Sequence, residues 1–253
     1  MPKVKLPPSN IGRVLLTRPL HKNQSLSRLL ADHGFETLSC PLIQVTSLQD
    51  EDLADKINAS DIVIAVSANA IASASTQLER WPDKTYIAVG KATEQAFSEL
   101  EIDATFPDDP RTEGLLELPQ LKQPKGKNIV ILRGNGGRET LAQQLVIRGA
   151  KVTYSELYRR DSVLLAKNVV EQWQRRGITT IVVTSAEILQ NLIEMVNNGY
   201  QSWLTDIYVI VPSIRVADIA SGQGIPNIRV ADGAGNQAIL DELKNLQSSF
   251  YEK

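Results

Sequence analysis

Hydrophobic positions fall in short runs that alternate with longer amphipathic segments, and residues 128–160 show this pattern most clearly. Residues 128–132 are rich in isoleucine and valine, which suits a strand buried on both faces of a parallel sheet. Leu141, Leu145 and Val146 then fall on one face of a helix that starts near Arg138 and ends at Gly149. Residues 151–158 resume an alternating extended pattern. The order strand, helix, strand predicts an α/β fold.

The same pattern occurs twice along the chain. Residues 13–19 match residues 128–134 at an offset of 115, residues 62–69 match 180–187 at 118, and residues 86–93 match 207–214 at 121. Loop insertions produce a slowly growing offset of this kind. The chain therefore contains an internal duplication of about 115 to 120 residues, which predicts two similar α/β lobes with parallel sheets.

Composition narrows the class of protein. The chain has 253 residues, of which 42% are hydrophobic and 22% charged, so two lobes can each bury a core. A single cysteine and two histidines leave no disulfide, thiolate cage or imidazole cluster, which predicts a cytoplasmic protein without a metal site. The net charge of −2 argues against nonspecific nucleic-acid binding.

Membrane and secretory segments are not expected. No apolar run approaches the roughly 18 residues of a membrane span. Residues 1–10 carry two lysines and three prolines without an apolar core, so we expect a flexible lead and no signal peptide. The lack of an obvious apolar patch predicts a monomer.

The glycine-rich turn after residues 128–132 is the first candidate binding site. Glycines there leave backbone N–H groups unshielded, and the following helix directs its positive dipole end at the same place. This is the construction of an anion site. Its candidate residues are Arg133, Gly134, Asn135, Gly136 and Arg138.

Other predicted strands end in similar turns, at the edge where ligands bind in open α/β sheets. Ser67 is explained by helix N-capping alone, which contributes about 1 kcal/mol. The same arrangement recurs at residues 184–186, so ligand binding by the helix-start amides stays open beside capping. The candidates in these turns are Arg18, Ser67, Ala68, Asn69, Lys91, Thr93, Thr184, Ser185, Ala186 and Ser213.

Several familiar chemistries do not fit the sequence. Glu139 stands where a dinucleotide fingerprint needs its third glycine, no Gly-Lys-Ser or Gly-Lys-Thr follows a glycine turn, and no Gly-x-Ser-x-Gly elbow is present. The remaining interpretation is a two-lobed protein whose cleft is lined by backbone N–H groups and hydroxyls. Such a cleft suits a large polyanion.

The motifs together resemble one enzyme family. Residues 133–139, RGNGGRE, are followed by Gly149-Ala150 and by Tyr158-Arg159-Arg160, and this order resembles bacterial uroporphyrinogen-III synthases. The resemblance covers nearly the whole chain. Its other motifs are LTRP at 16–19, VSANA at 66–70, AVGKAT at 88–93 and VTSA at 183–186.

The resemblance implies a cofactor-free cyclisation of the linear tetrapyrrole hydroxymethylbilane, with loss of water and inversion of ring D through a spiro intermediate. The product, uroporphyrinogen III, leads to haem and related tetrapyrroles. The implied fold is two flavodoxin-like lobes, each built from non-contiguous chain and joined by a two-stranded linker. Residues 1–38 with 163–253 would form one lobe, 45–155 the other, and 39–44 with 156–162 the linker strands. The hydrophobic pattern alone does not distinguish this division from a cut near Pro124.

The resemblance also implies residue roles. Tyr158 matches the family's tyrosine, which donates a proton to the departing hydroxyl; the residues alone suggest only interface packing for it. The candidate turns would bind the substrate's eight carboxylates. Val211 and Ile214 depart from the family pattern, and Ser213 is the nearest hydroxyl there. A transient contact with the upstream hydroxymethylbilane synthase is a further expectation.

Two other classes are weighed against this interpretation. A non-enzymatic two-lobed binding protein that closes over an anionic small molecule would use the same turns, but it would return its ligand unchanged. A receiver-like regulatory domain would need an acidic pocket after its first strand, and this chain has Thr17-Arg18 there.

Overall fold

The structure is a computed structural model that describes residues 11–196 and 199–250. The lead expected at residues 1–10 lies outside the described residues. The chain divides into two compact units: unit 1 contains Met1–Gln44 and Ser162–Lys253, and unit 2 contains Val45–Asp161. None of the described helices is both long enough and apolar enough to span a bilayer.

Unit 1 contains a five-stranded sheet in the order β11-β10-β9-β1-β2. All of its strand pairs are parallel. The strand β1 has Val14, Leu15 and Leu16 fully buried, because helices cover both faces of the sheet. The strands are β1 (Arg13–Leu16), β2 (Thr37–Ser39), β9 (Ile178–Val182), β10 (Tyr208–Val211) and β11 (Ile228–Val230).

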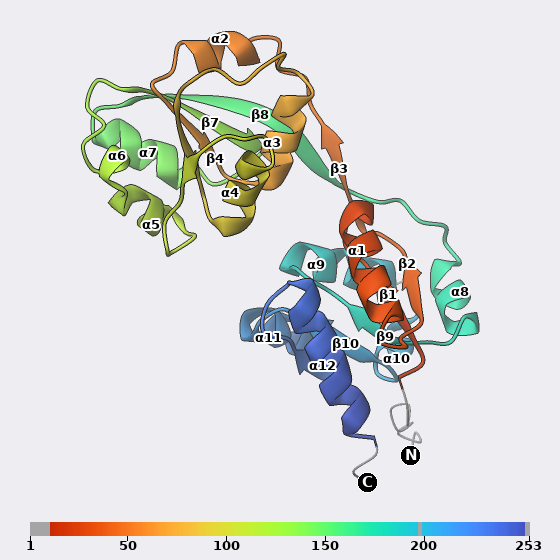
Figure 1. Cartoon of the computed structure of the whole chain (residues 1–253). Helices are drawn as coiled ribbons and strands as arrows, with labels where there is room; N and C mark the ends of the chain where they lie inside the picture. The colour runs from red at the N-terminus through yellow and green to blue at the C-terminus, as the bar shows by residue number, and fades with distance from the viewer. Residues whose placement is uncertain (1–10, 197–198, 251–253) are drawn as a thin grey trace. The chain divides into compact units, whose positions relative to one another are not determined.

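Successive side chains of β1 point to opposite faces of the sheet, and a separate hydrophobic core of unit 1 lies on each face. Val14 and Leu16 pack with α1 (Leu20–Ala31) and α12 (Asn236–Ser248), which lie side by side in Figure 1. Leu15 faces the other core. The helices that contribute to that core are α8 (Val169–Arg175), α9 (Ala186–Val196), α10 (Gln201–Leu204) and α11 (Ile214–Gly222).

Unit 2 contains a six-stranded sheet in the order β3-β8-β7-β4-β5-β6. The pairs among β8, β7, β4, β5 and β6 are parallel. The edge strand β3 runs antiparallel to β8, since the Leu48 N–H donates to Leu157 O while the Val163 N–H donates to Leu42 O. The strands are β3 (Ile43–Ser47), β4 (Ile62–Ala65), β5 (Thr85–Ala88), β6 (Ala104–Thr105), β7 (Asn128–Gly134) and β8 (Lys151–Ser162).

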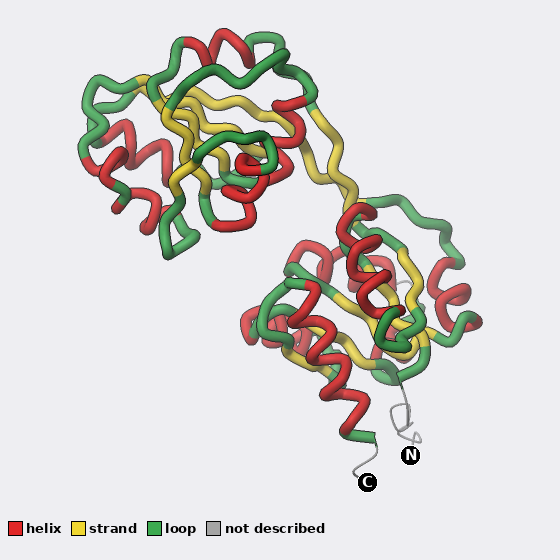
Figure 2. The backbone as a smooth tube through the Cα atoms, viewed as in Figure 1, coloured by secondary structure: helices red, strands yellow, loops and turns green. Residues whose placement is uncertain are grey.

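Helices cover both faces of this sheet as well (Figure 2). The helices α2 (Leu53–Asn58), α3 (Ala68–Ser75) and α4 (Lys91–Ser98) pack on Val63, Val130 and Leu132. On the other face, Ile64, Ile129 and Ile131 contact α5 (Thr112–Glu117), α6 (Pro119–Lys122) and α7 (Thr140–Ile147). The predicted mixed α/β fold with parallel sheets is confirmed.

The repeat seen in the sequence corresponds to a repeated strand order. The matched segments lie in β1 and β7, in β9 and β4, and in β10 and β5. These strands are neighbours in the same sequence in both sheets, β2-β1-β9-β10-β11 and β8-β7-β4-β5-β6. Equivalent strands therefore have the same spatial order in the two units. The chain visits these strands in a different order in each unit, because unit 1 begins with β1 and β2 whereas their equivalents in unit 2, β7 and β8, come last.

Some element boundaries differ from those expected. The helix expected near Arg138 begins at Thr140, because residues 135–139 form a turn with Gly136 at φ 68°. Helix ends are the least determined part of a hydrophobic pattern, since the first turn buries little surface.

Candidate functional site

A pair of hydroxyls marks the carboxyl edge of the unit 2 sheet. Ser67 follows β4 and Tyr158 belongs to β8, two strands away. The Ser67 hydroxyl donates to Tyr158 Oη at 3.0 Å and accepts from the Ala70 N–H at 3.2 Å. Ser67 therefore caps α3, as expected, and in the same geometry it holds the tyrosine hydroxyl.

A β-bulge in β8 directs the tyrosine to this place. Arg133 of β7 pairs with Glu156, whereas the next residue, Gly134, pairs with Tyr158, so Leu157 is the extra residue. The Leu157 carbonyl accepts from the Leu48 N–H and from the Ser73 hydroxyl. Leu157 and Tyr158 are consecutive yet both buried in the same core. A bulge re-aims a side chain in this way.

Gly134 leaves room for the tyrosine ring. A Cβ on Gly134 would lie 2.6 Å from Tyr158 Cζ and 3.1 Å from its Oη. Real side chains do not approach so closely, so any larger residue would displace the ring. The glycine predicted to bind substrate through its N–H is thus also required for packing.

The glycine turn holds a carboxylate that the protein itself supplies. Asn135 Nδ2 donates to Glu156 Oε2 at 2.6 Å, and the Gly136 N–H donates to Glu156 Oε1 at 3.4 Å. Arg133 Nε lies 3.8 Å from the same carboxylate. In the described structure these donors of the turn therefore contact the carboxylate of Glu156, and their binding of substrate stays a prediction.

The two arginines of this turn differ in exposure. Arg133 is buried, with Nε donating to Gly134 O at 3.2 Å and its guanidinium 4.5 Å from the Tyr154 ring centroid. Arg138 is exposed and forms no ion pair with any described residue. Of the two, only Arg138 presents its charge to solvent.

The remaining unit 2 candidates lie on neighbouring helix starts. Ala68 is exposed and Asn69 half-buried in the first turn of α3. Lys91 is exposed at the start of α4, where the extended Gly90 is the N-cap, while Thr93 is buried. Because β4 and β5 are adjacent and parallel, these residues share the edge of the sheet that carries Ser67.

Unit 1 carries its own set at the equivalent edge. Ser185 Oγ accepts from the Ile188 N–H at 3.2 Å and caps α9, as Ser67 caps α3. Thr184 and Ala186 flank it, half-buried. Ser213 is the N-cap residue of α11 without a side-chain bond to the helix. The candidates therefore form two groups, each at the carboxyl edge of its own sheet.

Arg18 is buried at the end of β1. Its Nη2 donates to Lys22 O at 2.6 Å and to Asn236 Oδ1 at 2.9 Å, and its Nη1 lies 3.4 Å from Ala234 O. Burial lowers the pKa of the Arg18 guanidinium from its ordinary value.

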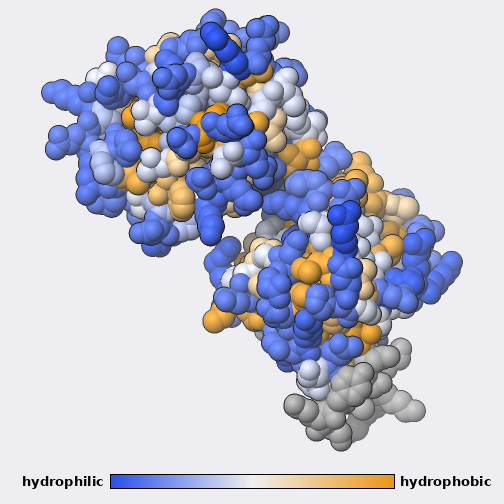
Figure 3. Space-filling view, viewed as in Figure 1, coloured by the Kyte–Doolittle hydropathy of each residue, from blue (hydrophilic) through white to orange (hydrophobic). Residues whose placement is uncertain are grey.

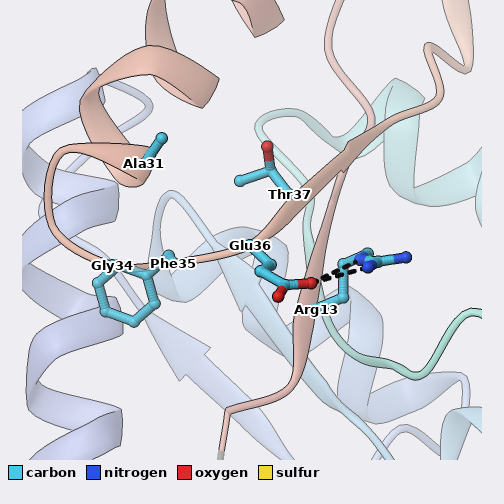
Figure 4. A pocket seen from close by; sticks show the side chains of 6 residues that line it. All are labelled: Arg13, Ala31, Gly34, Phe35, Glu36 and Thr37. Carbon is cyan, nitrogen blue, oxygen red and sulfur yellow. Dashed lines mark hydrogen bonds and ion pairs between the residues drawn. The ribbon is translucent and has the colours of Figure 1, made fainter.

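Two surface hollows lie at the opposite, amino ends of the strands. One, of about 420 Å³, is shown in Figure 4. Arg13 and Glu36, which both line it, form an ion pair with Arg13 Nη2 2.7 Å from Glu36 Oε2. The other, of about 610 Å³, is lined in part by Asp61, Lys84 and Lys127 of unit 2. No predicted site residue lines either hollow.

Sequence reasoning missed two residues that the structure places among the candidates. Glu156 occupies the glycine turn and Asn236 contacts Arg18. Alternation along 151–158 puts Glu156 on the same face as Val152 and Tyr154, and its partner turn is about 20 residues away, so no local signal marks this contact. Asn236 is 218 residues from Arg18, and no spacing signals that contact.

Comparisons with known proteins identify the family. A family model described as "Uroporphyrinogen-III synthase HemD" matches residues 24–241. The chain belongs to the uroporphyrinogen-III synthase family. The resemblance inferred from its motifs is therefore confirmed.

Relatives agree over nearly the full length of the chain. Uroporphyrinogen-III synthase of Salmonella typhimurium is 38% identical over 244 residues, covering 91% of this chain and 99% of that protein. The Escherichia coli protein of the same name is 36% identical with the same coverage.

Solved structures agree in fold. Uroporphyrinogen-III synthetase from Helicobacter pylori has a TM-score of 0.64 at 15% identity, over 93% of this chain and 99% of that one. A mutant uroporphyrinogen III synthase from Thermus thermophilus has a TM-score of 0.61 at 16% identity, over 96% and 100%. At these identities the likeness concerns the fold alone.

Proposed function

We propose that this protein is a uroporphyrinogen-III synthase: it cyclises hydroxymethylbilane with loss of water and inverts ring D through a spiro intermediate. The observation that carries the proposal is the 38% identity to a protein of that name over 91% of the chain. The product supplies haem and related tetrapyrroles. The proposal needs no cofactor.

Tyr158 is the proton donor in this proposal. As the substrate's C–O bond breaks, the phenol proton passes to the leaving oxygen and water departs, which leaves an electron-poor methylene carbon for ring D to attack. Ser67 supports this role because its hydroxyl donates to Tyr158 Oη, which leaves the tyrosine's own hydrogen for the substrate. A phenol is a weak acid, so we expect its contribution to lie near the lower end of general acid catalysis, about 10²-fold.

Positioning supplies the larger part of the rate. Ring D must be held in the orientation opposite to that of simple closure, and such preorganisation can lower a barrier by several kcal/mol. Because the net charge is −2, attraction of an octacarboxylate must be local. The exposed Lys91 and Arg138 and the helix starts at Ser67 and Ser185 support binding in this way.

The remaining sequence-based hypotheses belong to the same proposal. We infer two flavodoxin-like lobes, residues 1–38 with 163–253 and residues 45–155, joined by linker strands at 39–44 and 156–162. The strand orders of the two sheets support this inference, since 2-1-3-4-5 is the flavodoxin-like order and unit 1 has it. The protein acts in the cytoplasm as a monomer with a transient contact to hydroxymethylbilane synthase.

The experiment supplies hydroxymethylbilane to the purified protein and separates the I and III isomers of uroporphyrinogen by chromatography. Left alone, the bilane closes to the I isomer, so formation of the III isomer identifies the activity. A binding protein would leave the spontaneous yield of the I isomer as the only product, and that result would overturn the proposal. Heat-denatured protein is the matched blank.

A further inference from the structure

Arg18 is a buried cation without a counter-charge. Only 4% of the residue is exposed, and its hydrogen-bond acceptors, Lys22 O, Ala234 O and Asn236 Oδ1, are all neutral. Its Nε has no partner, and no carboxylate of the described residues lies within 4 Å of it. A buried charge is costly unless an opposite charge compensates it, which makes this arginine unusual.

The guanidinium points at the start of α12, a helix of 13 residues. The N-cap Gly235 has no side chain to satisfy the first-turn amides, and in the described structure no acceptor is found for the N–H groups of residues 236–238. Asn236 is fixed between Arg18 and Ser25, whose Oγ accepts from Asn236 Nδ2 at 3.2 Å. Free amides and the helix dipole add positive potential to that of Arg18.

A neighbouring histidine responds to the positive charge of Arg18. His21 and Lys22 lie in the first turn of α1, beside Arg18 in sequence. The pKa of His21 is lowered by burial first and then by the positive charges of Lys22 and Arg18. Asp232 precedes α12, but it is exposed and forms no ion pair with Arg18 among the described residues.

We propose that the start of α12, with Arg18 behind it, is a carboxylate-binding site of unit 1. The first-turn amides of α12 donate to a carboxylate group of the ligand, and Arg18 supplies the charge that makes an anion favourable there. The inference deepens the proposed function and rests on it, because the carboxylate is then one of the eight that the bilane carries. The site is built from unit 1 residues alone, whereas the Ser67 and Tyr158 pair belongs to unit 2.

Asn236→Asp tests the site because it builds the missing carboxylate into the protein. The introduced aspartate keeps the shape of asparagine, pairs with Arg18 and complements the helix dipole, so the thermal midpoint rises. The same carboxylate competes with the ligand, so KM for hydroxymethylbilane rises about tenfold while kcat stays near that of the unaltered protein. Asn245→Asp on the same helix is the matched control, since Asn245 is exposed and remote from Arg18.

Two further measurements make the outcomes decisive. Arg18→Gln raises KM about tenfold and Arg18→Lys raises it less, because lysine keeps the charge. Binding of uroporphyrin III, an octacarboxylate, is titrated by fluorescence and weakens by the same factor in Asn236→Asp. A higher thermal midpoint with KM and Kd changed less than about threefold would show that Arg18 only stabilises the fold.

The titration also separates this inference from the proposed function. If the unaltered protein forms no III isomer yet Asn236→Asp weakens uroporphyrin binding, the enzymatic proposal fails and the site stands. If the III isomer forms and neither KM nor Kd responds, the site fails and the enzyme stands.

Discussion

The ring of Tyr158 lies in the core of unit 2, whereas its hydroxyl lies at the carboxyl edge of the sheet. Only 5% of the residue is exposed and its ring packs in a hydrophobic cluster of unit 2, while Oη meets Ser67 at the carboxyl edge of the sheet. The ring is therefore held by packing, and Oη, the atom proposed to donate the proton, is its outermost one. A donor positioned in this way needs no conformational search before it acts.

Removal of the hydroxyl alone tests this role. Tyr158→Phe keeps the packed ring, so the protein should unfold at nearly the same temperature, while kcat for the III isomer falls by up to about 10². Rates of III formation and circular dichroism measure the two effects. Tyr208→Phe is the control, since it removes a phenol hydroxyl from unit 1 at the amino end of β10. Unchanged kcat in Tyr158→Phe would exclude the phenol from the chemistry.

Gly134 is the second residue-scale test. In Gly134→Ala the new Cβ would lie 2.6 Å from Tyr158 Cζ, so either the ring or β7 must move. We expect a loss of about 1 to 3 kcal/mol in the free energy of unfolding, measured in urea, together with a lower kcat. Gly222→Ala is the control because nothing lies within 4 Å of its Cβ position. With Tyr158→Ala already present, the cost of Gly134→Ala should shrink, and equal costs in both backgrounds would contradict the packing argument.

At the scale of elements, the turn between β7 and α7 is an anion site with an internal occupant. Glu156 bonds Asn135 and Gly136 there, in the place where the motif predicts a substrate carboxylate. The sequence predicted that the turn offers hydrogen-bond donors to an anion, but it did not predict which carboxylate binds to them. A substrate group that uses this turn must compete with Glu156.

This competition predicts the effect of Glu156→Gln. Neutralising the internal anion should lower KM for the bilane a few-fold, since a helix-start anion interaction is worth about 0.3 to 1 kcal/mol. Steady-state kinetics of III formation measure it. Glu99→Gln, an exposed position after α4, removes the same charge elsewhere and should leave KM unchanged. A rise in KM for Glu156→Gln would mean that Glu156 organises the turn and does not block it.

Asp50 joins two elements of unit 2 through its carboxylate. It accepts from Lys56 Nζ of α2 at 2.7 and 2.8 Å and from Ser155 Oγ of β8 at 2.6 Å. Burial alone would raise the pKa of Asp50, but the bonds from Lys56 and Ser155 outweigh it, so the pKa lies below its ordinary value of 3.8. The folded protein therefore binds this proton less readily than the unfolded chain.

The sign of this shift predicts how stability depends on pH. A carboxylate with a lowered folded pKa contributes stability that is present above its ordinary, unfolded pKa of 3.8 and is lost as pH falls through the folded value. Asp50→Asn should lower the free energy of unfolding at pH 7 and reduce its slope with pH below about 4. Urea unfolding at neutral pH and at two acidic values measures both. An Asp50→Asn protein with the same slope as the parent would contradict the assignment.

At the scale of the whole molecule, the two units have separate cores. The clusters around β4 and β7 are built entirely from residues between Val45 and Tyr158, inside unit 2. The cores of unit 1 combine residues from both ends of the chain, such as Leu16 with Leu243. On the face shown in Figure 3, hydrophilic residues cover most of both units and hydrophobic ones occur in small groups.

Separate cores predict that residues 45–161 fold alone. The fragment keeps its full set of core contacts and should show native-like far-UV circular dichroism and a cooperative thermal transition. Residues 1–44 alone should stay unfolded, because their apolar residues pack against segments after Ser162. A 45–161 fragment without a cooperative transition would show that unit 2 depends on unit 1 for stability.

The sequence by itself determined the alternation of strands and helices, the duplication and the family. Runs such as 128–132 and 180–184 are local patterns, and burial on both faces of a sheet requires the same apolar residues wherever the strand lies. Ser67 and Ser185 were predictable as caps for the same reason, since a cap acts within one turn of its own helix.

Only the tertiary structure decided how these parts meet. The bulge at Leu157, the contact of Ser67 with Tyr158 across 91 residues, and Glu156 in the glycine turn all depend on strand register and packing. Arg18, a predicted substrate-binding residue, is buried among neutral acceptors at the start of α12, and its position in the sequence gives no sign of these contacts. Such contacts join segments that no spacing along the chain relates, because they arise when separately formed elements share one core.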